Sequence, residues 1–312
     1  MTTSGSVDFS VSRDNLIEDA LRTAGIIGVD DSASSTQLTW AARLLNMMVK
    51  AWQPLGIALW ARKTGWILPQ TDVNEIDLGP SGDHATLSYT QTQIATAGTS
   101  GDSTIEVDSI TGISSGYYIG IEQDDGTMQW TTVNGAPSGT TVTLTAALTG
   151  DVDVDGYVWV YQTKIVRPLR ITEAYVRNET GKTEILIDVL AKQEYELLGA
   201  KEVDGVPNII AYDPLLTDGK AYIYPRIQDG ETLIKIVFQR PFEDFDAAGD
   251  TPDFPQEWYL ALMLNLSVLL APAGGLPVTD RKLLIQEATM ALEMAKSGDT
   301  EEGSLKIQPH IR

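Results

Sequence analysis

The feature of the sequence that most constrains its fold is a run of 100 residues, 64–163, that contains neither lysine nor arginine. This run holds 13 aspartate and glutamate residues, and therefore −13 of the net charge of −21. Most of it consists of short stretches rich in Val, Ile, Thr and aromatic residues, separated by glycine-containing turns such as Asp125-Gly126. This pattern is typical of antiparallel strands joined by tight turns. We therefore predict an all-β module at 86–163, a small sandwich or barrel, inserted into a domain of different composition.

The segments on both sides of this module carry helical signals. Ser12 is a candidate N-cap for a first helix, and Ser34 with Gln37 resembles a capping box for a second helix, which Pro54 ends. After the module, strand-like segments follow, interrupted by one short helix. Two further helices are expected near the C-terminus, over about 256–271 and 280–296.

We therefore predict the α+β fold class, with a four-helix core of two N-terminal and two C-terminal helices and a small β region. An inserted all-β sandwich or barrel interrupts this core, and an extended C-terminal tail follows it. Such an insertion requires the two ends of the module to lie close together. The predicted domains are a discontinuous core at 1–85 and 164–296, the inserted β domain at 86–163, and the tail at 297–312.

Composition excludes several classes of function. The sequence has no cysteine and two histidines, which removes disulfides, thiolate metal sites and cysteine nucleophiles and leaves little imidazole chemistry. With 22 Lys+Arg against 43 Asp+Glu, it lacks the surplus of cations that a protein needs to bind the phosphates of a nucleic acid. The longest apolar stretch, 258–271, is too short to cross a bilayer. We expect a soluble protein that binds no cofactor, no metal ion and no membrane.

Three patterns suggest chemistry, and each has a simpler structural interpretation. Asp151-Val-Asp153-Val-Asp155-Gly156 matches the first half of a calcium loop, but Gln162 stands where the bidentate Glu is expected. Gly112-Ile-Ser114-Ser-Gly116 matches the nucleophile elbow but lies in a β-rich turn region. A third pattern offers either the paired carboxylates of a glycosidase or a solvated acidic loop: Glu243, Asp244, Asp246, Asp250, Asp253 and Glu257. We predict no catalytic residue and no enzyme activity.

Three tryptophans are candidates for contacts between subunits, because tryptophan is enriched at protein interfaces. These residues are Trp60, Trp66 and Trp258. Trp52 instead falls on the apolar face of its predicted helix, where core packing is the simpler interpretation.

The flanking segments contain a series of short motifs. In order, they are Phe9-Ser-Val-Ser-Arg-Asp14, Leu44-Leu-Asn-Met-Met-Val-Lys-Ala-Trp-Gln53, Gly56 with Leu59-Trp60, Arg167-Pro-Leu-Arg170, Gln193-Glu-Tyr195, Pro207-Asn208, Tyr224-Pro225, Gln239-Arg-Pro241 and Asp253-Phe-Pro-Gln-Glu-Trp258. Taken in this order, the motifs resemble the head-to-tail adaptor family of tailed bacteriophages, whose members bind beneath the portal ring. The resemblance covers roughly 1–80 and 164–295, and many family members lack the β insertion.

The resemblance implies a structural protein of the virion, assembled in the host cytoplasm and located at the head–tail junction. Such adaptors form homo-oligomeric rings, typically of twelve copies, that lengthen the portal channel and dock tail tube, nozzle or tail-fibre proteins. Genomic DNA passes through the channel without specific binding. A predominantly acidic ring offers a polyanion weak attraction, which favours low friction during passage. We expect the acidic β insert to point outwards, because a bulky module would crowd a narrow channel.

The resemblance also implies a portal-binding role for the C-terminal tail, which in related adaptors reaches into the portal. The tail lacks helical or strand periodicity, and its composition allows it to order on a partner. The residues predicted to contact the portal are Leu305, Lys306, Ile307, Gln308, Pro309, His310, Ile311 and Arg312.

Two alternatives remain open from the sequence. The first is a virion-associated cell-wall glycosidase, which requires two carboxylates facing each other across a cleft. The second is a decoration or carbohydrate-binding protein in which the β insert is the functional part.

Overall fold

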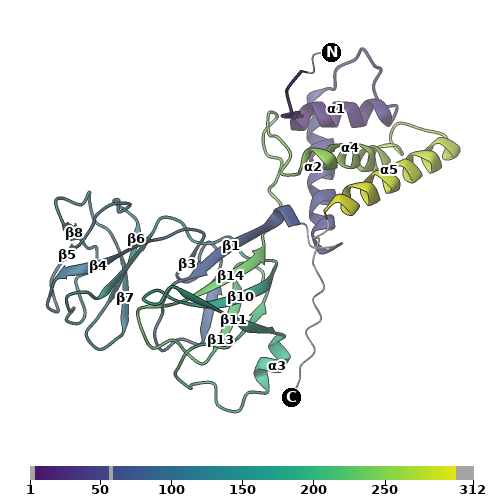
Figure 1. Ribbon diagram of the computed structural model, residues 1–312. Coiled ribbons are helices and arrows are strands. Elements are labelled where there is room, and N and C mark those ends of the chain that lie inside the picture. The colour runs from purple at the N-terminus through teal and green to yellow at the C-terminus, as the bar shows by residue number, and fades with distance from the viewer. Residues whose placement is uncertain (1–3, 56–58, 300–312) are drawn as a thin grey trace. The chain divides into compact units, whose positions relative to one another are not determined.

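The computed structural model describes residues 4–55 and 59–299. The chain forms two compact units. One unit comprises Met1–Ala61 and Phe242–Arg312, and we call it the helical unit. The other comprises Arg62–Pro241, and we call it the β unit. Both units are drawn in Figure 1.

The helical unit contains four long helices and three short 3₁₀ segments in its described part. Ser12 caps the first helix by accepting a hydrogen bond from the Asn15 N–H, and Ser34 forms a capping box with Gln37 at the second, so both predicted caps are confirmed. The elements are α1 (Arg13–Thr23), α2 (Ser35–Trp52), η1 (Gln53–Leu55), η2 (Leu59–Ala61), η3 (Gln256–Trp258), α4 (Tyr259–Leu270) and α5 (Val278–Gly298).

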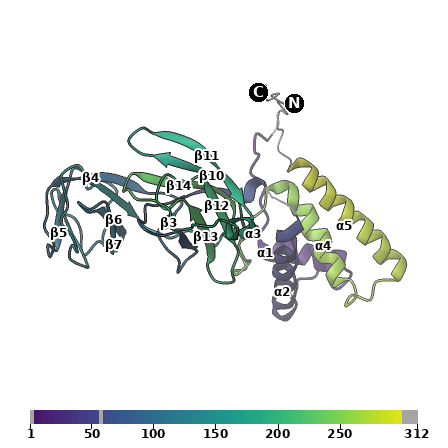
Figure 2. The same ribbon diagram turned by 90° about the horizontal axis from the view of Figure 1, so that it is seen from below.

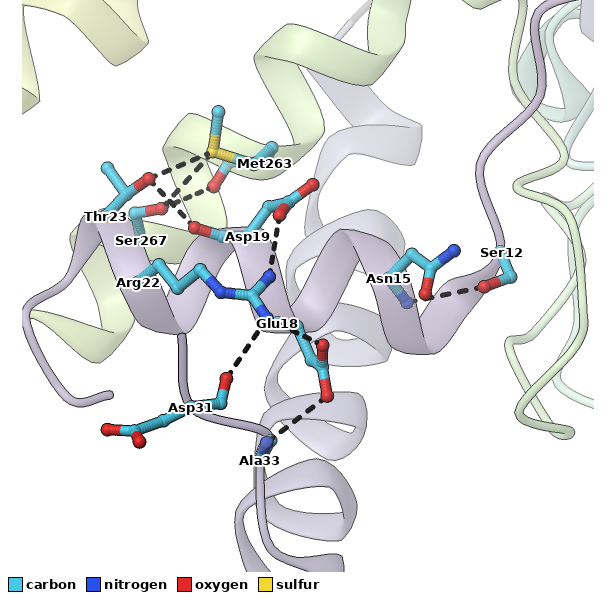
Figure 3. A network of polar contacts seen from close by, with 10 residues as sticks. All are labelled: Ser12, Asn15, Glu18, Asp19, Arg22, Thr23, Asp31, Ala33, Met263 and Ser267. Atoms are coloured by element: carbon cyan, nitrogen blue, oxygen red, sulfur yellow. Dashed lines mark hydrogen bonds and ion pairs between the residues drawn. The ribbon is translucent and has the colours of Figure 1, made fainter. Parts of the chain in front are cut away.

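A polar network fixes the connection between α1 and α2. The Arg22 guanidinium donates to the carboxylates of Glu18 and Asp19 and to the backbone carbonyl of Asp31. The Glu18 carboxylate also accepts from the N–H of Ala33, the residue that precedes the N-cap of α2. Figure 3 shows these contacts converging on Arg22. The network thus ties the α1 surface to the start of α2.

Helix α4 forms the centre of the helical unit and packs against α1, α2 and α5. Its buried side chains are spread around much of its circumference, which is typical of a helix enclosed by other elements. These buried residues are Tyr259, Ala261, Leu262, Leu266, Ser267 and Leu270.

The first sheet of the β unit has eight strands in the order β2-β13-β12-β11-β10-β14-β1-β3. The pairing is antiparallel except between β11 and β12, which are parallel and connected through the short helix α3. The elements are β1 (Arg62–Ile67), β2 (Glu75–Leu78), β3 (Ala85–Thr86), β10 (Arg170–Asn178), β11 (Thr183–Leu190), α3 (Lys192–Glu196), β12 (Ile209–Asp213), β13 (Gly219–Tyr224) and β14 (Thr232–Gln239).

The second sheet has six strands in the order β7-β6-β9-β4-β5-β8. All six strands come from the segment without lysine or arginine, and their inward-facing Ile and Val side chains form a separate core. The strands are β4 (Thr90–Thr96), β5 (Thr104–Val107), β6 (Tyr118–Glu122), β7 (Met128–Thr132), β8 (Thr141–Thr143) and β9 (Tyr157–Tyr161).

The predicted fold class is wrong in its proportions. The β region outside the insert is an eight-stranded sheet and not a small accessory to a four-helix core. The cause is long-range pairing, in which β1 pairs with β14 from Arg62↔Gln239 to Ile67↔Ile234. Local sequence patterns identify single strands but do not reveal partners so far apart in the chain. Two segments that the sequence separates therefore form one sheet.

The two ends of the segment that forms the six-stranded sheet meet at β3. Thr86 Oγ1 donates to the carbonyl oxygen of Thr163 at 2.8 Å, and the Ile165 N–H donates to the Ala85 carbonyl oxygen at 2.8 Å. The predicted domain boundaries stay a prediction, but this closeness is what an insertion requires. In the described part of the chain, no helix has the length and apolar character needed to span a membrane.

An aromatic cluster holds the two sheets of the β unit together. Trp159 and Tyr161 of β9 pack with Leu68, which directly follows β1, and with Leu233 of β14. Trp159 Nε1 also donates to the Gly230 carbonyl oxygen at 2.7 Å, so the buried indole is satisfied across the junction. We call this group of residues the junction cluster.

His84 lies in this junction as a neutral base. Its ring stacks on Trp130 with a centroid distance of 3.9 Å, and its Nδ1 lies 2.9 Å from the Tyr161 hydroxyl. Burial, with a smaller contribution from the Lys164 ammonium, lowers the pKa of His84 to about 3. The folded state therefore holds this imidazole neutral in a range where the unfolded chain protonates it.

This shift predicts a pH-dependent stability of the β unit. The His84 contribution is complete above pH 6.5, the ordinary pKa, and is lost as the pH falls from 6.5 towards 3, by at most about 1.4 kcal/mol per pH unit. His84→Phe keeps the stacking on Trp130 and removes the titration. Urea unfolding between pH 7 and pH 5 should show a smaller loss of free energy of unfolding in this variant than in the natural chain. Equal losses in both proteins would contradict the assignment.

Candidate functional site

Helix α5 packs through one side only. Its main contacts with other elements are with α4 and η3, and Figures 1 and 2 both show it running along α4. The packed side carries Leu284, Ala288, Ala291 and Ala295, all buried and spaced 4, 3 and 4 residues apart. This spacing keeps one seam of a helix facing a neighbouring helix.

A second seam of the same spacing lies beside the first and is exposed. It consists of Asp280, Leu283, Glu287, Met290 and Met294, and we call it the α5 stripe. Three of its five residues are large and apolar, and their exposed fractions are 55% for Leu283, 66% for Met290 and 74% for Met294. Heptad spacing with apolar residues is typical of a helix that packs against a partner helix. The helical unit of one copy leaves this seam uncovered.

Helix α2 carries a face of opposite charge, in which Arg43 and Met47 are exposed and the other two residues are half-buried. Its residues are Trp40, Arg43, Met47 and Lys50, spaced 3, 4 and 3 residues apart, and we call it the α2 face. Met47 is 59% exposed. Arg43, Met47 and Lys50 also line a hollow of about 810 Å³ beside the loop that contains Phe245. The face therefore combines apolar side chains with two cations in a strongly acidic protein.

The two cations of the α2 face differ in their partners. Lys50 Nζ pairs with the Asp244 carboxylate at 2.7 Å and donates to the Phe242 carbonyl oxygen at 2.6 Å. Arg43 is exposed, and within residues 4–55 and 59–299 no hydrogen bond or ion pair engages its guanidinium. Five donors in a planar fork are thus available to a carboxylate from another molecule.

Trp60 and Trp258, two of the predicted interface residues, lie in an aromatic cluster of the helical unit. The Trp60 ring is 4.8 Å from the ring of Phe242 and 4.8 Å from that of Phe254. Trp258 is 8% exposed and contacts Trp60 at a ring-centroid distance of 6.5 Å. Their role between subunits stays a prediction.

Trp66, the third predicted interface residue, lies on β1 in the β unit. The Arg177 guanidinium lies 5.5 Å and the Lys235 ammonium 5.9 Å from its ring centroid, and Tyr89 packs against it edge-on. Trp66 is half-buried by these neighbours. Its role in subunit contacts also stays a prediction.

The carboxylates of the acidic cluster organise the loop between β14 and α4. The Asp250 carboxylate accepts from the N–H groups of Asp246 and Ala247, and the Asp253 carboxylate accepts from the N–H of Glu243. These bonds shape a loop, which is the simpler interpretation of the pattern. The lack of enzyme activity stays a prediction.

The two remaining motifs lie in turns of the six-stranded sheet. Gly112 and Gly116 both have φ of +81°, a conformation that glycine adopts easily in turns. The Asp151 carboxylate accepts from the Ser100 N–H at 2.8 Å, and Asp155 has φ of +69°. Within the described ranges, no group of three or more His, Cys, Asp or Glu side chains is arranged to hold a metal ion.

The predicted portal-binding residues, Leu305 to Arg312, lie outside the described residues. The α5 stripe and the α2 face are not among the residues predicted from the sequence. A signal for the first was present, because Leu283, Met290 and Met294 follow heptad spacing.

Comparisons with known proteins identify no family for this chain. No protein family matches it, and no curated protein matches its sequence. Among solved structures, it is similar to the gp54 tailspike of Acinetobacter baumannii bacteriophage AP22, solved in complex with an A. baumannii capsular saccharide. That similarity has a TM-score of 0.21 and 17% sequence identity, and it covers 25% of this chain and 15% of the tailspike chain. A similarity of this size supports no inference about fold or function.

The positions of Trp60 and Met290 predict that substitution lowers the free energy of unfolding strongly at the first residue and hardly at the second. Trp60→Ala removes a ring from the aromatic cluster and should lower the free energy of unfolding of the helical unit by about 3 kcal/mol. Met290→Ala removes an exposed side chain and should change it by less than about 0.5 kcal/mol. Urea unfolding of dilute protein measures both. A neutral Trp60→Ala variant that weakens self-association would instead place Trp60 at the subunit interface.

Proposed function

We propose that the protein is a structural component of a tailed-phage virion, a head-to-tail adaptor whose copies assemble into a ring beneath the portal. The observation that carries this proposal is the α5 stripe, an exposed apolar seam at heptad spacing. Burying a Leu or Met side chain contributes about 1.5–3 kcal/mol. Three such residues on one helix therefore favour association of the helical unit with another chain.

The β unit also has uncovered apolar residues. Ile185 and Leu186 are neighbours on β11, so their side chains point to opposite faces of the strand, and both are exposed. Neither face of the sheet is therefore covered at this end of β11. Uncovered apolar surface on both units fits a protein that works in an assembly.

The charge of the chain fits the passage of DNA through such a ring. The net charge is −21, and many of the cations of the described chain are paired with carboxylates, as in Arg177 with Glu179 and Lys235 with Glu184. Paired cations on an acidic protein hold phosphates weakly, because retention of DNA depends on unpaired Lys and Arg. The ring would dock on the portal and on tail components, with the C-terminal tail as the portal-binding segment.

Assembly through the α5 stripe is tested by two neighbouring substitutions. Met290→Glu adds a charge within the stripe, whereas Thr289→Glu adds the same charge about 100° away on the exposed surface of the same helix. We expect the natural chain and Thr289→Glu to form multimers at high concentration, and Met290→Glu to remain a single copy. Analytical ultracentrifugation over a wide concentration range measures this. A natural chain that stays a single copy throughout argues against the ring.

The competing interpretation, a carbohydrate-binding protein, places the function in the β insert. It predicts that full-length protein binds capsular or cell-wall polysaccharide in calorimetry and that removal of 87–162 abolishes this binding. The adaptor proposal predicts no polysaccharide binding and undiminished self-association of the shortened chain. Because the deletion uncovers Leu68 and Leu233, both are replaced by Thr in the shortened variant, and circular dichroism verifies its fold.

A further inference from the structure

The α5 stripe and the α2 face match each other as the two halves of one helix–helix interface. Both have the spacing of alternating three- and four-residue steps that an interhelical seam requires. They lie on different helices of the helical unit, and α4 packs against both of these helices. Within the described residues, Arg43 and Met47 of the α2 face and all five residues of the α5 stripe are exposed.

The match extends to the individual layers when the two helices run antiparallel. If Arg43 lies opposite Glu287, the register of the two helices is fixed. Because both surfaces have the same three- and four-residue steps, three further pairs of residues then face each other, and we call each facing pair a layer. Each apolar residue meets an apolar residue, and the exposed Arg43 guanidinium meets a carboxylate. Lys50, which already pairs with Asp244 of its own copy, meets a second carboxylate. The four layers are Trp40 with Met290, Arg43 with Glu287, Met47 with Leu283, and Lys50 with Asp280.

Other pairings of the same surfaces lack this agreement. In a parallel arrangement with Trp40 opposite Asp280, the equal steps place Arg43 opposite Leu283 and Met47 opposite Glu287. Two α5 stripes packed antiparallel on each other place Asp280 opposite Met290 and Leu283 opposite Glu287. Burying an unpaired carboxylate against an apolar side chain is costly. Charge and polarity therefore favour the antiparallel contact between α5 and α2.

We propose that α5 of one copy packs antiparallel against α2 of the next copy, through the α5 stripe and the α2 face. This inference rests on the proposed ring and names the surfaces that build it. Because the two surfaces differ, the interface is heterologous, and each copy uses one surface for each neighbour. Contacts of this kind close into a ring when the rotation from one copy to the next brings a whole number of copies through one full turn.

A charge exchange tests the central ionic layer. Arg43→Glu and Glu287→Arg each place like charges opposite one another and should weaken self-association by about tenfold or more. The double variant restores opposite charges and should recover most of this loss. Both residues are exposed, so folding is retained, and circular dichroism checks it. Single variants that associate like the natural chain, or a double variant without recovery, would overturn the inference.

Crosslinking gives an independent test, because the sequence contains no cysteine. Oxidation of a Met47→Cys, Leu283→Cys double variant should link successive copies covalently and give a ladder of multimers on a non-reducing gel. The control pair Met47→Cys with Thr289→Cys lies outside the predicted layer and should give little product. Multimers by ultracentrifugation without a ladder would refute the α2–α5 contact and leave the ring standing. Absence of multimers in every variant and in the natural chain would refute the ring itself.

Discussion

The packing of α5 on α4 is the interaction on which the proposed assembly depends. Small and apolar side chains, chiefly alanines, fill the buried seam and let α5 lie close against α4. One helix covers only one side of another, so the adjacent seam with Leu283, Met290 and Met294 stays exposed. A helix at the edge of a bundle thus packs against its own unit with one face and leaves the next face exposed.

Ring packing and hydrogen bonds at one junction hold the two sheets of the β unit together. The junction cluster joins large rings from the six-stranded sheet to apolar residues of the eight-stranded sheet, and indole N–H groups donate to backbone carbonyls across the junction. Within the six-stranded sheet, the Trp130 ring lies so close to Gly120 that a Cβ atom there would stand 2.6 Å from it. The packing of the rings and the two indole hydrogen bonds together link this sheet to the eight-stranded sheet.

Local chemistry made the helices and the strands of the six-stranded sheet predictable, whereas the long-range pairing of strands was not predictable. Ser12 and Ser34 identified two helix starts because capping involves residues only three positions apart. Short β runs indicated the strands of the six-stranded sheet, but not that β1 and β14 lie side by side. The fold class was wrong for this reason. The candidate site was not predicted, because the exposure of a helix face depends on which elements pack against the helix, although the heptad spacing was visible.

The most direct measurement is a cryo-electron microscopy reconstruction of the full-length protein in its assembled form. We predict a closed ring in which α2 of each copy covers the α5 stripe of its neighbour and Arg43 contacts Glu287. Particles containing a single copy, or a ring in which Leu283, Met290 and Met294 still face solvent, would contradict it.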